Sequence, residues 1–370
     1  MESHLKAIGI AREYEMRTIA CEVCGKSDFA TLQTRGRIGP PGTYGALPIV
    51  ICHRCGFKQI NPRYEDRFYL DYYDELYRKV SFDEDDAVPS EKYLGQQTVR
   101  GDAVRKWVER HTGPANGRRT LDHGCASGAT MLSWCDNGWR PVGIDPHRPS
   151  VELGKSRFGL DIQVAPGEAL PFPDADFDLV LSLGSLEHVY DLDRAMNELR
   201  RVLRPGGHLV IRWRSDVIFG SPLEYYNHNH YRYFSRVTWR LLLMRYGFEV
   251  DKETDQRLEG WDSYEYTLAR YVDRKSDVDA LVARGFGDSA AEIVFEHKAL
   301  RRDFAQRCRQ FLDFVGEPGR TAEDVVQAVR DRTIAWRGLL GGDAESVVRR
   351  AAMEADLYLR QIEQHPEILD

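Results

Sequence analysis

The strongest restriction on the fold comes from a glycine-bounded turn in the middle of the chain. Residues 121–130 read LDHGCASGAT, an apolar run that ends at Gly124 and gives way to a helical stretch after Gly128. Glycines at both ends let a ligand approach the backbone closely, and the N-terminus of the following helix offers N–H groups. The next apolar run ends in Asp145, whose carboxylate can accept hydrogen bonds from both hydroxyls of a ribose. Turn and acid together indicate a site for an adenosine-containing cofactor.

Short apolar runs alternate with helical stretches around this turn. Residues 192–203, for example, place leucine, alanine and methionine at helical intervals. Strands that alternate with helices predict βαβ units and a parallel sheet. The expected strands are 119–122, 141–145, 161–165, 177–183 and 208–214. The fold class predicted for the middle of the chain is therefore α/β.

Four cysteines near the N-terminus form two matched pairs. Cys21 and Cys24 make one CxxC, Cys52 and Cys55 make the second, and 27 residues lie between the pairs. Two such pairs can form a closed tetrahedral sulfur set, which suits Zn²⁺ in a structural role because no position stays open for water. The alternative is four buried or redox-active cysteines, which the matched spacing disfavours. We expect the remaining cysteines to be core thiols, namely Cys125, Cys135 and Cys308.

Composition narrows the class of protein further. At 370 residues the chain is long enough for two or three domains. Both signs of charge are interspersed and the net charge is −7, so we expect no nucleic-acid partner. No apolar run approaches the roughly 18 residues of a membrane span, and residues 1–16 lack an apolar core of the signal-peptide type. We therefore expect a cytoplasmic protein with no membrane partner.

The pattern becomes helical after about residue 276. An apolar stripe predicts one helix, Thr321 with Asp324 predicts the N-cap of a second, Gly341 and Gly342 interrupt the pattern, and residues 344–364 predict a third. These helices could pack internally, cover a cleft or form a homodimer interface. The stripe consists of Leu300, Phe304, Cys308, Phe311 and Val315.

The turn and three later segments together resemble class I methyltransferases that use S-adenosylmethionine (SAM). GCASG, with Asp122 two residues before Gly124, resembles motif I of that family and lacks the G-x-G-x-x-G of dinucleotide-binding proteins. The LPF…FD segment at 170–178, SLGSLEHV at 182–189 and LRPGG at 203–207 resemble later family segments in the correct order. One departure is Ala126, which replaces the central glycine of the turn and is tolerable with a negative φ.

This resemblance implies a Rossmann-like class I methyltransferase core that binds SAM. Residues 1–75 would be a zinc-ribbon module, 76–275 the SAM-binding methyltransferase domain and 276–370 a helical C-terminal region. Asp122 and the glycine turn would hold the methionine part of SAM, and Asp145 the ribose. The implied cofactor-binding residues are Asp122, Gly124, Cys125, Ala126, Gly128, Asp145, Gly167, Glu168 and Ser182.

A narrower resemblance involves the segment CGFKQINPRYEDRFYLDYYDELY at 55–77. A ribbon followed by NPR and tyrosine pairs is similar to zinc-ribbon methyltransferases that act on nucleotide-linked sugars. The C-methylating members carry a Tyr-x-Glu-His run before Tyr-Phe-Ser, and they use it to deprotonate a carbon beside a keto group. Here the run is NHNH at 227–230, so only His230 matches. Loss of the glutamate removes a charge that would support the base, and a hydroxyl acceptor needs less support.

We therefore expect a small-molecule methyltransferase whose substrate is a sugar or sugar nucleotide, with O-methylation slightly favoured over C-methylation. The candidate catalytic bases are His230 and His188, because histidine titrates near neutral pH. Each histidine could instead be a hydrogen-bonded structural ring. The residues expected to bind substrate are Tyr226, Asn227, His228, Asn229, Glu187 and Tyr190.

Three other classes of protein compete with this interpretation. The substrate could be another natural product, with the ribbon only capping the cleft. The protein could bind or modify RNA, as zinc ribbons often do, but its Lys and Arg do not cluster and the segment after the fourth strand lacks an amino-methylating motif. The fold could also be a scaffold without turnover.

Overall fold

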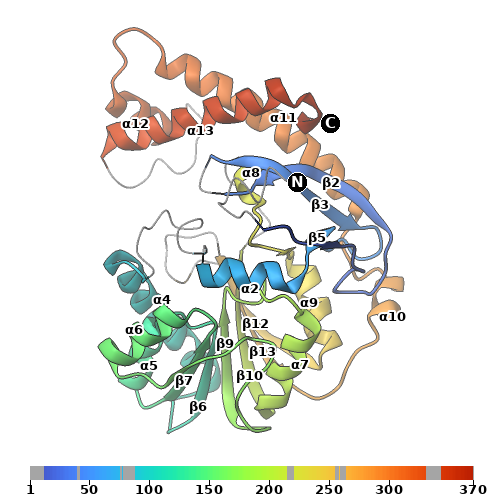
Figure 1. Cartoon of the computed structure of the whole chain (residues 1–370), viewed down its shortest axis with the longest axis vertical. Helices are drawn as coiled ribbons and strands as arrows, with labels where there is room; N and C mark the ends of the chain where they lie inside the picture. Colours follow the sequence, from blue (N-terminus) through green and yellow to red (C-terminus); the bar gives the residue numbers. More distant parts are fainter. Residues whose placement is uncertain are drawn as a thin grey trace.

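The computed structural model describes residues 12–39, 42–75, 77, 88–214, 221–254, 258, 264–330 and 343–369. Three layers follow one another in space (Figure 1). C-terminal helices form the upper layer, N-terminal strands lie beneath them, and an α/β domain occupies the lower half.

The α/β domain is built on a seven-stranded sheet in the order β12-β13-β10-β9-β6-β7-β8. Strand β13 runs antiparallel to both of its neighbours, and the pairs among the five strands from β10 to β8 are parallel. The strands are β6 (Arg119–His123), β7 (Arg140–Asp145), β8 (Ile162–Val164), β9 (Phe177–Leu183), β10 (Leu203–Arg214), β12 (Phe248–Glu253) and β13 (Tyr264–Tyr271). The Rossmann-like α/β fold class is confirmed.

Helices cover this sheet because each presents an apolar stripe to it. In α7 the residues at helical spacing, including Leu192, Met196 and Leu199, are buried against the core as their spacing predicts. The helices are α4 (Glu91–Thr112), α5 (Leu132–Cys135), α6 (Arg148–Phe158), α7 (Leu192–Val202) and α9 (Arg236–Arg245), with a short 3₁₀ turn η1 (Ala129–Met131). The single-turn helix α8 (Pro222–Tyr225) packs instead against the N-terminal strand β2 (Phe29–Arg37).

Cys135 corrects one expectation. Cys125 and Cys308 are buried as predicted, but Cys135 is exposed. The reason is its position as the last residue of the single-turn helix α5, where the chain leaves the sheet for solvent.

The N-terminal strands form two small sheets. Strands β1 (Met16–Arg17) and β5 (Arg63–Tyr64) pair with each other. The second sheet has the order β11-β4-β3-β2, with β2 (Phe29–Arg37), β3 (Tyr44–Cys52), β4 (Lys58–Ile60) and β11 (Arg232–Tyr233). Strand β11 lies between β10 and β12 of the α/β domain in sequence, so this N-terminal sheet is completed by residues that lie shortly after His230. Helix α2 (Asp66–Glu75) lies between this layer and the α/β sheet (Figure 1).

The C-terminal region is helical as expected and has its own core. Its helices are α10 (Val278–Ala283), α11 (Ala290–Val315), α12 (Ala322–Arg330) and α13 (Ala344–Gln364), followed by η2 (Pro366–Leu369). Thr321 and Asp324 exchange backbone-to-side-chain hydrogen bonds at the start of α12, as the sequence predicts. Phe304, Cys308 and Phe311 of the predicted stripe pack in a cluster with α13. Gly341 and Gly342 lie outside the described residues.

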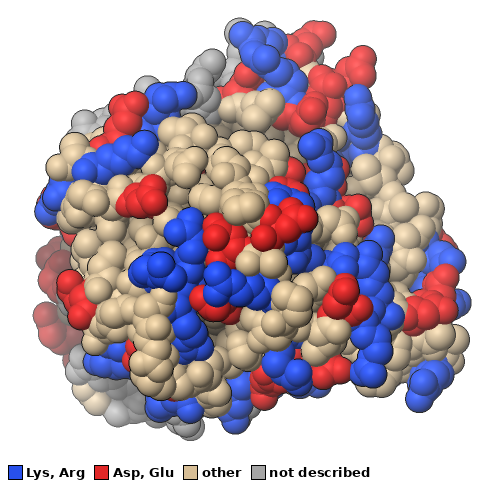
Figure 2. All heavy atoms as spheres, turned by 90° about the horizontal axis from the view of Figure 1, so that it is seen from below, with Lys and Arg blue, Asp and Glu red and all other residues tan. Residues whose placement is uncertain are grey.

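Two further properties concern the surface charge and the length and apolarity of the helices. On the face shown in Figure 2, Lys and Arg are interspersed with Asp and Glu and do not form a field of one sign. Within the described residues, no helix combines the length and apolarity needed to cross a membrane.

Candidate functional site

One large cleft lies at the carboxyl ends of the central strands. Its volume is about 1320 Å³, and residues from the ends of β6, β7 and β9 line it. The strand order reverses between β6 and β9, which is where open α/β sheets bind ligands. The glycine turn forms one wall, and α2 with Asn227, Asn229 and His230 forms a second wall, called the facing wall below.

The glycine turn is tied to the end of β7. The backbone N–H groups of Gly124 and Cys125 both donate to the carbonyl oxygen of Ile144 at 2.9 Å. The Ala126 N–H donates to Asp145 Oδ2 at 2.8 Å. Ala126 has φ +50°, so the expected negative φ is wrong. The hydrogen bond to Asp145 explains the difference, because it turns this N–H toward the acid.

Gly124 is the position in the turn where a side chain has no room. Its φ is +82°, and a Cβ there would lie 2.5 Å from Cβ of Ser185. The Ser185 hydroxyl donates to the His123 carbonyl oxygen at 2.7 Å, which joins the turn to the segment after β9. Gly128 and Ser182 lie behind this surface and outside the cleft lining. Ser182 reaches the site indirectly, through a 2.7 Å hydrogen bond between its Oγ and that of Ser185.

Asp122 is a buried carboxyl near the end of β6, two residues before Gly124. Burial first, and the neighbouring Asp145 second, raise its pKa to about 7. Its Oδ2 has no hydrogen-bond partner among the described residues. A cationic ligand would stabilise the ionised form of this group, and SAM carries both a sulfonium and an ammonium group.

Gly167 and Glu168, which the resemblance implies as cofactor-binding residues, line the cleft. A Cβ on Gly167 would lie 2.4 Å from Nε2 of His123, so the ring fills the space under this backbone. Glu168 Oε1 accepts hydrogen bonds from the backbone N–H groups of Tyr190, at 2.7 Å, and Asp191. His123 lines the cleft but was not among the predicted residues. Its position directly before Gly124 is the sequence signal that could have identified it.

The facing wall divides the predicted substrate residues into two sets. Asn227, Asn229 and His230 line the cleft, together with Glu187, His188 and Tyr190. Tyr226 and His228 are buried behind it, where Tyr226 packs on Tyr233 and the His228 ring meets Tyr72 edge-on at 5.0 Å. Residues 227–230 form a turn, closed by a hydrogen bond from the His230 N–H to the Asn227 carbonyl oxygen at 3.2 Å, and the division follows the course of this turn.

Glu187, His188 and His230 form a compact polar group on this wall. One donor atom from each lies within 4.8 Å of the others. Burial lowers the pKa of His188 to about 4 and that of His230 well below its ordinary value, while burial raises the pKa of Glu187 to about 7. Both imidazoles are therefore neutral at neutral pH. Tyr73 of α2 also contacts this group, because its Oη lies 2.9 Å from Nδ1 of His188.

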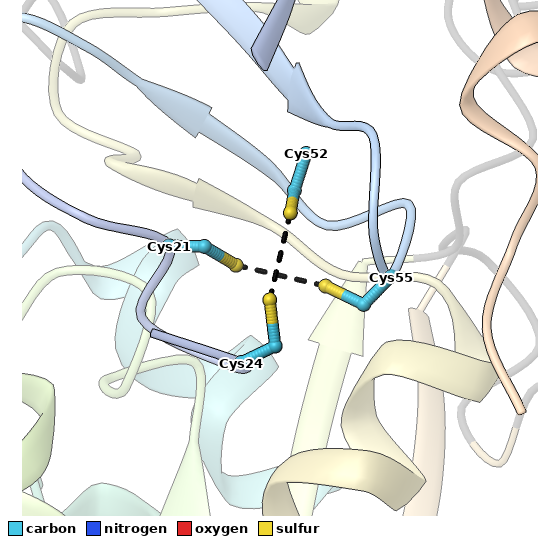
Figure 3. A group of neighbouring side chains, drawn as sticks. All are labelled: Cys21, Cys24, Cys52 and Cys55. Atoms are coloured by element: carbon cyan, nitrogen blue, oxygen red, sulfur yellow. Dashed lines mark hydrogen bonds between the residues drawn. The ribbon is translucent and has the colours of Figure 1, made fainter. Parts of the chain in front are cut away.

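The four paired cysteines converge from two turns (Figure 3). The Sγ atoms of Cys21 and Cys55 lie 3.6 Å apart, and those of Cys24 and Cys52 lie 3.5 Å apart. Disulfides need about 2.05 Å, whereas four sulfurs around an ion at about 2.3 Å lie roughly 3.8 Å apart. The Gly25 and Gly56 N–H groups donate to the carbonyls of the first cysteine of each pair and close both turns. The cluster therefore fits a tetrahedral metal ion.

Comparison with known proteins places the α/β domain in a family. The sequence model of a methyltransferase domain family matches residues 121–211. The chain is 31% identical over 183 residues to a protein of Mycolicibacterium smegmatis described as a probable S-adenosylmethionine-dependent methyltransferase, covering 46% of this chain and 70% of that relative. It is 32% identical to an O-methyltransferase of Penicillium expansum over 34% of this chain and 47% of the relative.

Among solved structures, the chain is similar to the 1,6-didemethyltoxoflavin-N1-methyltransferase of Burkholderia thailandensis with bound S-adenosylhomocysteine. The TM-score is 0.39 and the identity is 19%, over 50% of this chain and 82% of that one. Fold and cleft define a class of cofactor-binding α/β transferases. The domain match and the M. smegmatis relative show that the chain belongs to the SAM-dependent methyltransferase family.

Proposed function

We propose that this enzyme transfers the methyl group of SAM to a hydroxyl of a sugar or nucleotide-linked sugar. The observation that carries the proposal is the composition of the wall that faces the cofactor turn. It presents amide, imidazole and carboxyl groups from Asn227, Asn229, His230, His188 and Glu187. Groups that both donate and accept hydrogen bonds suit a polyhydroxylated substrate better than an apolar one.

The chemistry asks mainly for alignment and for removal of one proton. As the acceptor oxygen bonds to the methyl carbon, the C–S bond breaks and sulfur keeps the electron pair, which gives S-adenosylhomocysteine. The hydroxyl proton passes to His230 or His188. His188 Nδ1 lies 2.7 Å from the Asn229 carbonyl oxygen. A carbonyl only accepts, so Nδ1 holds a proton and Nε2 has the lone pair that can take another.

C-methylation beside a keto group is the second candidate, and Tyr73 supports it. The Nδ1–H of His188 faces the Tyr73 oxygen as well as the Asn229 carbonyl, so the Tyr73 hydroxyl accepts and its own proton stays available. That proton could stabilise an enolate. The stretch at 227–230 nevertheless lacks the tyrosine and glutamate of the C-methylating relatives, so O-methylation remains the first candidate.

Arginines on the cleft support a phosphorylated substrate such as a sugar nucleotide. Arg37 lines the cleft with its Nη1 3.7 Å from a Glu224 carboxylate oxygen, and Arg214 lies over the Tyr225 ring at 4.6 Å. Guanidinium groups held in this way can form bidentate hydrogen bonds to the oxygens of a diphosphate.

We also propose that Cys21, Cys24, Cys52 and Cys55 hold a structural Zn²⁺. The convergence of four free thiols at the spacing of a tetrahedral site supports this proposal. Four protein ligands leave no open position, so the ion would stabilise the fold and take no part in methyl transfer.

Incubation with SAM and a panel of nucleotide sugars, in hydroxy and keto forms, tests the proposed function. Mass spectrometry should detect the gain of one methyl group on a hydroxyl. His230→Ala should abolish turnover and leave SAM binding intact by calorimetry. His208→Ala is the matched control, because His208 lies outside the cleft and pairs with Asp251. Methylation of other natural products but of no sugar would refute the substrate class.

A further inference from the structure

A second group of metal-ligating side chains lies inside the cleft. Within the described part of the chain, two groups of three or more such residues bring their donor atoms within 4.8 Å. One is the cysteine cluster, and the other is Glu187, His188 and His230. We propose that Glu187, His188 and His230 bind a divalent transition-metal ion on the substrate wall.

The carboxylate of Glu187 points to a missing ligand. The side chain is 7% exposed, and its Oε2 has no hydrogen-bond partner among the described residues. A buried carboxylate oxygen without a partner costs free energy, and structures usually compensate it with a donor or an ion. Glu187 is among the residues that line the cleft, so its carboxylate lies at the cleft wall.

The ring of His188 is oriented by a hydrogen bond in the way that is common for metal-binding histidines. Its Nδ1–H is fixed by the backbone carbonyl of Asn229 at 2.7 Å, so Nε2 carries the lone pair. A backbone carbonyl on one ring nitrogen with a metal on the other is a recurring arrangement in metalloproteins, because it fixes the tautomer and orients the ring.

The ring of His230 is supported by Asn227. The Asn227 amide nitrogen lies 3.3 Å from Nδ1 of His230, and Asn227 Oδ1 has no partner among the described residues. Rotating the amide exchanges its oxygen and nitrogen, which differ little in shape. Rotation gives up the 3.5 Å contact between the amide nitrogen and the Tyr225 carbonyl oxygen. Oδ1 then accepts from Nδ1–H of His230, which leaves the lone pair of Nε2 free to coordinate.

Two imidazoles and one carboxylate select the kind of ion. This donor set suits Mn²⁺, Fe²⁺, Co²⁺ or Zn²⁺ rather than the all-oxygen preference of Mg²⁺ or Ca²⁺. Three protein ligands leave coordination positions open toward the cleft, where two oxygens of a diol or hydroxyketone could bind. A coordinated hydroxyl is more acidic, so with the ion bound it would lose its proton to water in the open cleft, and the imidazoles, whose lone pairs then bind the ion, would act as ligands rather than as bases. This last step rests on the proposed function, whereas binding of the ion does not.

Cobalt titration of the zinc-loaded full chain tests the site directly. We expect one equivalent of Co²⁺ beyond the zinc, seen as visible d–d absorption without the sulfur-to-cobalt charge transfer that exchange into the cysteine cluster would produce. Glu187→Gln and His188→Ala should each weaken Co²⁺ binding at least tenfold while zinc content and SAM affinity stay unchanged. His208→Ala, at an imidazole outside the cleft, should bind Co²⁺ like the wild type.

The absence of a second equivalent, or a second equivalent that both cleft substitutions leave unchanged, would overturn the inference. Neither result depends on turnover. Methylation of a nucleotide sugar by protein that binds no Co²⁺ would refute the cation site and leave the proposed function standing. Co²⁺ binding without methylation of any sugar would refute the proposed function and leave the cation site standing.

Discussion

Arg232 donates two hydrogen bonds to the carboxylate of Glu22, with Nε to Oε2 at 2.8 Å and Nη2 to Oε1 at 2.6 Å. Glu22 lies between the first two paired cysteines, and Arg232 lies two residues after His230. The same carboxylate accepts two hydrogen bonds from Arg63. Burial alone would raise the pKa of Glu22, but the two arginines outweigh it and hold the pKa below its ordinary value. The cysteine cluster and the substrate wall are therefore joined through one buried ionic group.

Glu22→Gln should strongly destabilise the protein. It leaves the guanidinium groups of Arg232 and Arg63 buried without a counter-charge, with only a neutral amide and backbone carbonyls as partners. Breaking such a group costs roughly 3–5 kcal/mol. Glu65→Gln is the matched control, because Glu65 pairs with a largely exposed Arg17 at 3.8 Å. The control should cost less than about 1 kcal/mol. Equal shifts of the two variants in urea unfolding would contradict this account.

Cys24→Ser should remove the metal that we propose for the cysteine cluster. Zinc content should fall from one ion per chain to a small fraction, and the melting temperature should fall, because structural zinc contributes folding free energy. Cys135→Ser changes an exposed cysteine and should leave both values unchanged. A wild-type protein without zinc by elemental analysis would refute the cluster as a zinc site.

Patterns that are local in sequence predicted much of the fold. The apolar alternation around Gly124 predicted the parallel strands, and the residues predicted for the last helix coincide with α13 (Ala344–Gln364). Periodicity extends over many residues in these elements, so each carries its own signal. The two cysteine pairs also met as their spacing predicted.

Features that depend on distant pairing were not predictable in this way. Strand β11 has two residues, and its pairing with β4 joins Arg232 to Gln59 across nearly half of the chain. No periodic pattern exists in so short a strand. The approach of Glu187 to His230 likewise depends on where the loop after α8 packs. The positive φ of Ala126 reflects a hydrogen bond to Asp145, which a sequence pattern does not contain.

Two glycines on α4 should respond to alanine in opposite directions. A Cβ on Gly101 would lie 2.0 Å from the carbonyl oxygen of Thr130, so Gly101→Ala must push α4 away from the cofactor turn. The cost should be about 1–3 kcal/mol, with weaker SAM binding. A Cβ on Gly95 meets nothing within 4 Å, so Gly95→Ala should stabilise the helix by about 0.5–1 kcal/mol. Chemical denaturation of both variants measures the difference, and two shifts of the same sign would contradict the packing argument.

SAM binding should release a proton below neutral pH, and Asp122 should be its source. The pKa of Asp122 is raised to about 7, above its ordinary 3.8, so the cofactor-free protein loses stability as the pH rises from about 4 through 7. A cationic ligand favours the ionised carboxylate, so SAM affinity should fall as the pH falls through 7, up to about tenfold per pH unit. Calorimetry at pH 6 in two buffers of different ionisation enthalpy counts the released proton. Asp122→Asn keeps the shape, loses the titration and should give a flat profile, whereas the same proton release from this variant would assign it to another group.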